Sequence, residues 1–302
     1  MATIPADTPL PSRHRATSRL YALVKAAREA PLAAVVILGG LILAALLADV
    51  LAPYDPTLPV KGAEMFAPPF WMEGGSLATP LGTDFQGRDI LSRLLYGARV
   101  SLIVGLMGTL VAGSIGTALG IVSGYLGGWV DQIIMRVTDA WLALPAIVFA
   151  IFLAAMVGPS MWNIIVILGL VYWTRYARVI RGEVLSLRER DFVKLAEIAG
   201  ASKLRVIRKH ILPNVLNTAT VLASLTVGVV IIAEASLSFL GVGVPPPQPA
   251  WGLMLSEARP TLMAGQWWLT VFPGFCILLI VLATQLFGDW LRVRLDPQTR
   301  NL

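Results

Sequence analysis

The chain has 302 residues, of which 56% are apolar and only 14% are charged, and its formal net charge is +6. Soluble domains carry about 25% charged residues, so water cannot be the solvent for most of this surface. The long apolar runs contain glycine and proline, which favours helices over the alternating strands of a membrane barrel. The composition therefore predicts an all-α polytopic membrane protein.

The N-terminal region predicts a polar tail followed by a membrane helix. Residues 1–30 are polar and carry five basic side chains. The apolar run at 31–48 has 18 residues, more than the roughly 7–15 of a signal-peptide core. We therefore expect a cytoplasmic tail over 1–30 and an uncleaved first transmembrane helix over 31–52.

Six apolar segments are long enough to be spans, since a helix needs about 20 residues to cross the hydrocarbon core. Pro145 and Pro273 predict kinks in the third and sixth of them. The spans are expected near 31–52, 99–123, 136–157, 161–178, 214–240 and 268–288. This division gives an external segment at 53–98, a five-helix core at 99–290 that includes a cytoplasmic loop at 179–213, and a cytoplasmic C-terminal tail at 291–302.

The basic residues predict the orientation of these spans. If the N-terminus is cytoplasmic, the inner segments hold 19 of the 24 Lys and Arg residues and the outer segments hold five. Cytoplasmic segments of membrane proteins carry the excess of basic residues. We therefore expect both termini in the cytoplasm, and the charge indicates membrane topology rather than a nucleic-acid partner.

Few residues within the spans can carry chemistry. Glu234 is the only acid well inside a span, and an ionisable residue there is a functional candidate by default. With Ser236 and Ser238 it forms a candidate translocation path, although the structural interpretation, in which it hydrogen-bonds a neighbouring helix or lies at the outer interface, is favoured. The only two histidines, His14 and His210, lie in different segments, so no metal site is predicted. The lone Cys276 lies in an apolar run and is expected in the core.

The external segment is too long to be a structureless connection. Gly82-Thr83-Asp84 predicts a turn, and Asp84 or Asp89 can cap the helical stretch 90–96 that leads into the second span. We therefore expect 53–98 to be folded.

The 179–213 loop predicts two helices around a glycine. Residues 183–190 continue the fourth span, and Asp191 is expected to cap a short helix with Phe192, Leu195 and Ala199 on one face. Gly200 suits the left-handed conformation that ends a helix. Ser202 is expected to cap a second helix through His210, before Pro213 begins the fifth span. The pattern suits docking to another protein, or a basic face near anionic lipid.

This loop resembles the one that couples importer permeases to their ATPase subunits. Lys194-Leu195-Ala196 stands where the common form has Glu-Ala-Ala, Gly200 matches its glycine, and His210-Ile211-Leu212-Pro213 matches its closing proline. The sequence departs from the family in placing Lys194 for the acid and Leu195 for a small residue. Whether Glu197 replaces the acid from the next turn is open. The resemblance implies a role in ATPase coupling for Asp191, Lys194, Leu195, Ala196, Glu197, Gly200, Ser202, His210 and Pro213.

Two further segments resemble the second permease subunit of the dipeptide, oligopeptide and nickel ABC importer family. One is the stretch 233–241. The other is the external motif that contains Gly82, Thr83, Asp84, Gly87, Arg88 and Asp89. The likeness extends over about 30–297.

The resemblance implies a permease subunit in the inner membrane that forms half of a path for di- or oligopeptides delivered by an external binding protein. It implies a homologous second permease, two ATP-binding subunits that hold ATP and Mg, contact with membrane lipid, and no cofactor in this chain. Nickel, glutathione, opines and oligosaccharides are alternative substrates. The sequence has no Gly-x-x-x-x-Gly-Lys-Ser/Thr phosphate loop, so ATP hydrolysis is assigned to partners. An ion-coupled secondary transporter would call for paired acids or inverted repeats, and neither is evident.

Overall fold

The computed structural model describes residues 31–295, and the regular elements in this part of the chain are helices, with no strand. The predicted tail at 1–30 and the end of the C-terminal tail, 296–302, lie outside it. The helices are α2 (Leu32–Leu46), α3 (Ala48–Leu51), α4 (Ile90–Leu126), α5 (Gly128–Leu142), α6 (Ala146–Val157), α7 (Met161–Arg188), α8 (Asp191–Ile198), α9 (Lys203–Val206), α10 (Leu212–Phe239), α11 (Trp251–Ala258) and α12 (Trp268–Leu295). A π-helix (Ile207–Ile211) joins α9 to α10, and a 3-10 helix (Arg259–Ala264) follows α11.

The all-α membrane class is confirmed, whereas the number of spans is only partly tested. Four helices among the described residues are long and apolar enough to cross a membrane: α4, α7, the run Lys203–Phe239 and α12. The pair α5 and α6 makes a fifth if it is one bent span, and α2 is a shorter apolar helix of 15 residues. The sixth span and the cytoplasmic termini therefore stay predictions.

The third predicted span, 136–157, is not one helix. α5 ends at Leu142, α6 begins at Ala146, and the two meet at 90°. The break has a local cause, because Pro145 has no N–H for an intrahelical bond and takes an extended ψ of 121°. The expected kink at Pro145 is thus a full break. α12, by contrast, continues through Pro273 as one helix.

Two helices extend well beyond the spans predicted for them. α4 has 37 residues, which corresponds to about 55 Å, and α7 has 28 residues, or about 42 Å. The extension of α7 to Arg188 confirms that the loop after the fourth span begins as a helix. α4 begins at Ile90 because the side chain of Asp89 accepts a hydrogen bond from the Ser92 N–H at 2.7 Å, as predicted for this cap.

α4 and α7 pack closely because glycines line their contact. A Cβ atom placed on Gly116 would lie 2.2 Å from the Trp173 carbonyl oxygen, and one on Gly120 would lie 2.8 Å from the Ala177 carbonyl oxygen. Neither distance is compatible with a side chain. Helices in lipid associate mainly through such close packing, since lipid is as apolar as their surfaces. The glycines of the second span therefore serve helix packing.

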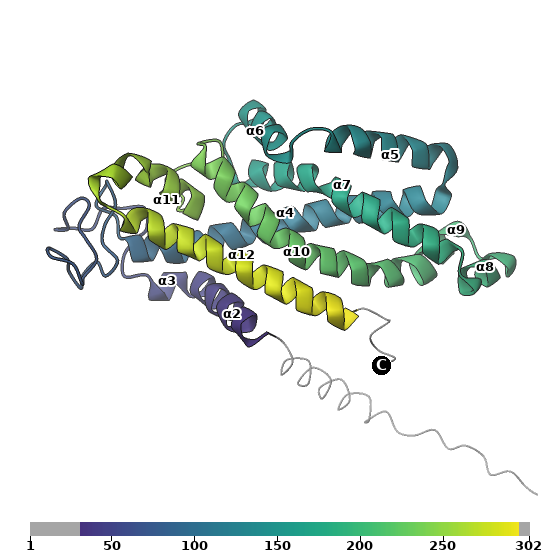
Figure 1. Ribbon diagram of the computed structural model, residues 1–302, viewed down its shortest axis with the longest axis horizontal. Coiled ribbons are helices and arrows are strands. Elements are labelled where there is room, and N and C mark those ends of the chain that lie inside the picture. Colours follow the sequence, from purple (N-terminus) through teal and green to yellow (C-terminus); the bar gives the residue numbers. More distant parts are fainter. Residues whose placement is uncertain (1–30, 296–302) are drawn as a thin grey trace, which may run out of the picture.

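The two segments that lie outside the predicted spans are at opposite ends of the long axis of the bundle. The 53–89 segment and α11 lie at one end, which we call the α11 end, and α8 and α9 lie at the other, the α8 end (Figure 1). The core at the α11 end surrounds Trp251 and Trp268, and the core at the α8 end includes Tyr125, Val193 and Ile211. α4 contributes residues to both.

The packing of α4 on α7 generates a prediction. Gly116→Val should lower the thermal unfolding midpoint of the detergent-purified protein, because the new side chain overlaps the α7 backbone. Overpacking typically costs about 1–3 kcal/mol, and a clash with a main-chain atom relaxes less easily than one with a side chain. Gly182→Val is the matched control, because it puts the same residue on α7 at a position with no atom within 4 Å. Equal midpoints for the two variants would contradict this account of the contact.

Candidate helix-glycine-helix loop and buried charge cluster

The 179–213 loop turns at Gly200, as predicted. Gly200 has a φ of 81°, in the left-handed region where a side chain is strained. The N–H of Ala201 donates to the Ala196 carbonyl oxygen at 3.0 Å, and the N–H of Gly200 donates to that of Glu197 at 3.0 Å. This pair of bonds is the Schellman motif, which satisfies carbonyl groups at the end of a helix. The motif fixes the direction in which the chain leaves α8.

The prediction for the start of α8 is wrong in one respect. Arg190 occupies the N-cap position, and no side chain caps the helix there. Asp191 is the first helical residue, where its carboxylate still has a favourable interaction with the helix dipole. Ser202 does occupy the N-cap position of α9, but its side chain forms no capping bond.

The second predicted helix does not end before Pro213. α9, the π-helix and α10 follow one another without a break, so Lys203–Phe239 is a single helical run. Pro213 lies in the first turn of α10 and cannot donate a main-chain hydrogen bond. In the π-helix before it, the N–H of Leu212 reaches back to the Ile207 carbonyl oxygen. This wider turn lets the chain pass the proline while remaining helical.

Three contacts hold α8 against the bundle. Val193 is fully buried, in the same cluster as Val206 and Ile211, and the half-buried Ala196 packs on that cluster. The ring of Phe192 lies 6.0 Å from that of His210. The hydroxyl of Tyr125, near the end of α4, donates to Glu197 Oε1 at 2.8 Å.

The other face of α8 is apolar and exposed. Leu195 is 64% exposed and Ile198 is 82% exposed. Lys194, on the same helix, forms an ion pair with Glu189, with 2.9 Å between Nζ and Oε2. The hydrogen bond from Lys194 lowers the pKa of the Glu189 carboxyl. Lys194, which stands at the family's acidic position, thus has an acidic partner within this chain. Glu197 instead accepts a hydrogen bond from Tyr125 of α4.

The 53–89 segment is folded around Thr83, as the sequence led us to expect. The Thr83 hydroxyl donates to the Glu64 carbonyl oxygen at 2.6 Å and accepts from the Ala67 N–H at 2.9 Å. Gly82 and Gly87 have φ values of 86° and 74°, so both bends use conformations that favour glycine. Burial raises the pKa of Asp89, against the hydrogen bonds from Ser92.

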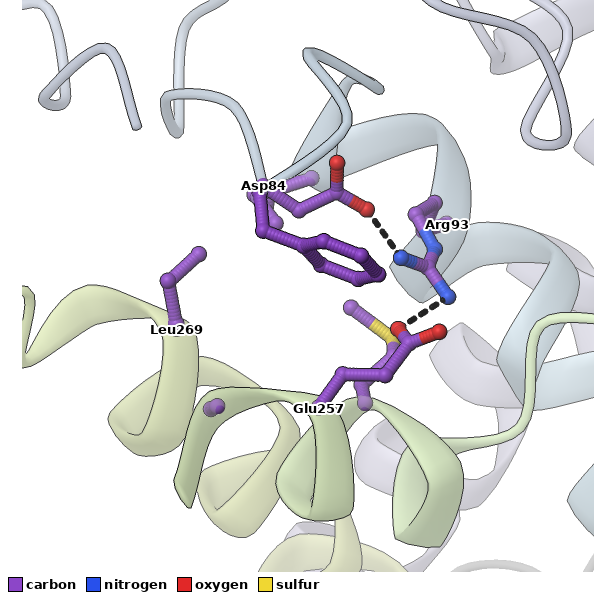
Figure 2. A pocket seen from close by; sticks show the side chains of 8 residues that line it. Asp84, Arg93, Glu257 and Leu269 are labelled. Carbon is purple, nitrogen blue, oxygen red and sulfur yellow. Dashed lines mark hydrogen bonds and ion pairs between the residues drawn. The ribbon is translucent and has the colours of Figure 1, made fainter. Parts of the chain in front are cut away.

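Three buried charged side chains and the partly buried Glu257 join this segment to α11. The Arg88 Nε atom is 2.6 Å from Asp84 Oδ2, and its Nη2 atom is 3.1 Å from Glu257 Oε1. Arg93, on α4, forms ion pairs with the same two acids, with 2.8 Å between its Nη2 and Glu257 Oε2. Figure 2 shows Arg93 between Asp84 and Glu257. Two cations and two anions therefore form a balanced cluster.

Sequence reasoning identified Asp84 and Arg88 but missed Glu257. This residue lies 169 positions after Arg88, on a helix that the sequence analysis did not predict. A buried arginine needs an acidic partner, and the chain contains only 18 acidic residues from which that partner could come. Nothing in the local sequence, however, pairs Glu257 with these arginines.

The three candidate path residues on α10, Glu234, Ser236 and Ser238, do not form one hydrogen-bonded group. Glu234 is fully buried and accepts a hydrogen bond from the Ser238 hydroxyl at 2.7 Å. The same hydroxyl oxygen accepts from the Val244 N–H at 3.0 Å. Ser236 is half-buried and donates to the Ile232 carbonyl oxygen of its own helix. In this chain alone Glu234 and Ser238 stabilise the turn after α10, and their place on a translocation path stays a prediction.

Comparisons with known proteins agree with the resemblance. The family described as "Binding-protein-dependent transport system inner membrane component" matches residues 116–301. The dipeptide transport system permease protein DppC of Escherichia coli (strain K12) is 45% identical over 257 residues, 85% of each chain. The di/tripeptide transport system permease protein DppC of Pseudomonas aeruginosa is 40% identical, over 87% of this chain and 88% of that protein. The glutathione transport system permease protein GsiD of Pectobacterium atrosepticum is 42% identical, over 76% of each.

The buried cluster generates a second prediction. Arg93→Met should destabilise the protein by about 3–5 kcal/mol, because Asp84 and Glu257 would share a single buried cation. The matched control is Arg99→Met, which removes an arginine from the same helix whose partner, Asp49, is largely exposed. Exposed pairs contribute about 0–1 kcal/mol. Denaturation of the purified protein should separate the two variants, and a loss as large for Arg99→Met as for Arg93→Met would contradict the assignment.

Proposed function

Because the chain belongs to the family of inner-membrane components of binding-protein-dependent transport systems, we propose that it is one of two permease subunits of an ATP-driven importer. A homologous second permease completes the translocation path, and two partner subunits bind ATP and Mg. An external binding protein delivers the substrate. The chain itself is a permease subunit and not an enzyme.

Di- or tripeptides are the proposed substrates. Two of the relatives above carry dipeptide or di/tripeptide names, and each aligns with more than four fifths of this chain. Glutathione is the second candidate, because a relative of similar identity carries that name.

The exposed face of α8 is the proposed contact for coupling to the ATPase subunit. Leu195 and Ile198 present apolar surface at the α8 end, on a helix held by Val193 and Glu197. Exposed apolar side chains on a rigid element are typical of a protein interface. We assign this face to the ATPase subunit, which must contact the permease physically for hydrolysis to move it.

A six-span topology with both termini in the cytoplasm is also part of the proposal. The separation of 53–89 from α8 along the bundle supports it, since a single membrane then divides the two segments (Figure 1). α2 supplies the first span, and the bent pair α5 and α6 supplies the third.

The topology has a direct test. In a Cys276→Ala background, single cysteines at Leu77 and Ser202 should lie on opposite sides of the membrane, and both positions are exposed. A membrane-impermeant thiol reagent added to intact cells should label the cysteine at 77 and spare the one at 202. The reverse pattern would overturn the orientation.

Coupling is tested at Gly200. Gly200→Val should leave this chain in the membrane at normal levels but prevent loaded binding protein from stimulating ATP hydrolysis, and it should abolish uptake of alanyl-alanine into proteoliposomes. The physical reason is backbone strain of about 1–3 kcal/mol at a positive φ, which would reorient α8 relative to α9. Gly200→Asn should retain much of the activity, because asparagine tolerates this conformation.

Gly265→Val is the matched control, since Gly265 has a φ of 86° and open space around it but lies at the α11 end. It introduces the same strain away from α8 and should leave ATP hydrolysis coupled to uptake. A Gly200→Val complex that transports at the unmutated rate would remove the coupling role of this loop. Failure of the unmutated complex to take up alanyl-alanine or glutathione would contradict the proposed substrates.

A further inference from the structure

A polar hollow of about 650 Å³ lies between α7, α10 and α12 at the α8 end. α10 lies between the other two helices (Figure 1). The α10 residues that line the hollow run from Asn214 to Leu225, which corresponds to about 16 Å along the helix. Sites for small molecules typically measure roughly 300–1,000 Å³, so the hollow is large enough for a short peptide.

Three guanidinium groups and one carboxylate line this hollow: Arg175, Arg190, Arg292 and Glu183. Within residues 31–295 none of these arginines forms an ion pair. The contrast with the rest of α7 is informative, because Arg178 and Arg181 of the same helix pair with Asp139 and Asp131. Among the described residues, the arginines that line the hollow thus have no acidic partner.

Glu183 also has a carboxylate oxygen that can accept a further hydrogen bond. Its Oε2 atom is shielded from solvent and has no hydrogen-bond partner in the described part of the chain. A buried acceptor without a donor is unfavourable, so a cationic or N–H donor that reached Oε2 from the hollow would be stabilised there. Arg175 and Glu183 are eight residues apart on α7, which places their Cα atoms about 12 Å apart along the axis.

This spacing suits a short zwitterion. A fully extended dipeptide or tripeptide spans about 7–11 Å, and its ends carry one carboxylate and one ammonium group. Long side chains at both positions can close the remaining distance. Arginine is well suited to the carboxylate, which it can bind through two parallel hydrogen bonds.

We infer that the hollow is a substrate site on the cytoplasmic half of the translocation path, where Arg175 binds the terminal carboxylate of a short peptide and Glu183 binds its ammonium group. The inference rests on the proposed function and narrows its substrate class. The lining carries a net charge of +2 from three arginines and one glutamate, which repels a free divalent cation. Glutathione and opines carry carboxylates and fit the same chemistry, whereas a neutral oligosaccharide does not.

The test uses the whole complex in proteoliposomes, with labelled alanyl-alanine and the cognate binding protein. Arg175→Gln should reduce uptake about tenfold or more, the effect expected when a charge-assisted hydrogen bond is lost. ATP hydrolysis stimulated by the loaded binding protein should persist. Arg175→Lys keeps the charge and should retain more uptake than Arg175→Gln. The matched control is Arg136→Gln, which removes an exposed arginine of α5 outside the hollow and should transport normally.

A second substrate separates this site from the selectivity of the binding protein. Alanyl-alaninamide lacks the terminal carboxylate, and its affinity for the binding protein is measured separately so that uptake is compared at equal loading. The unmutated complex should transport the acid faster than the amide, and Arg175→Gln should remove that difference.

Equal uptake of acid and amide by the unmutated complex would overturn the inference while leaving the proposed function intact, and this comparison requires no variant to fold. A preference for the acid that survives Arg175→Gln would overturn the role of Arg175. If the unmutated complex transports neither peptide nor glutathione, the proposed function fails and this inference fails with it.

Discussion

The close contact between α4 and α7 is the constraint on which the rest of the molecule depends. Lipid gives helices no hydrophobic reason to associate, so the glycines of α4, which admit the α7 backbone, supply the packing. α4 is long enough to reach both ends of the bundle, and its position on α7 therefore decides what each end contacts. Its first turns place Arg93 beside Glu257, and its last turn places Tyr125 beside Glu197.

This arrangement gives the two ends different physical characters. At the α11 end, the buried Asp84, Arg88 and Arg93 and the partly buried Glu257 neutralise one another, which makes the 53–89 segment part of the bundle. At the α8 end, the helix that protrudes is held by the buried Val193, the ring contact of Phe192 with His210 and one hydrogen bond from Tyr125 to Glu197. In the proposed importer, this distribution of burial would give a stable outer structure and an inner element that responds to a partner.

The polar and charged groups near the spans also differ in whether they are enclosed in the bundle or border a hollow. Glu234 is enclosed in the bundle, where its Oε1 atom accepts a hydrogen bond from Ser238, whose hydroxyl oxygen accepts from the Val244 N–H. Its Oε2 atom has no partner in the described part of the chain. Arg175 and Glu183 border an open hollow instead, and their charges are not matched by neighbours in the described chain. Charged groups that border an open hollow are better placed to meet a moving substrate than a carboxyl group enclosed in the core.

Several features could be read from the order of residues because they depend only on near neighbours. The membrane class follows from composition, the start of α4 from Asp89 three residues before Ser92, and the end of α8 from the conformational freedom of Gly200. The continuous run through Pro213 was not anticipated, since whether a proline ends a helix or is bypassed by a wider turn depends on the packing of Val206 and Ile211. The pairing of Arg88 with Glu257, the engagement of Glu197 by Tyr125 and the hollow between α7, α10 and α12 join distant parts of the chain. Only the packing of the helices decides these contacts, because no short-range preference encodes which helices become neighbours.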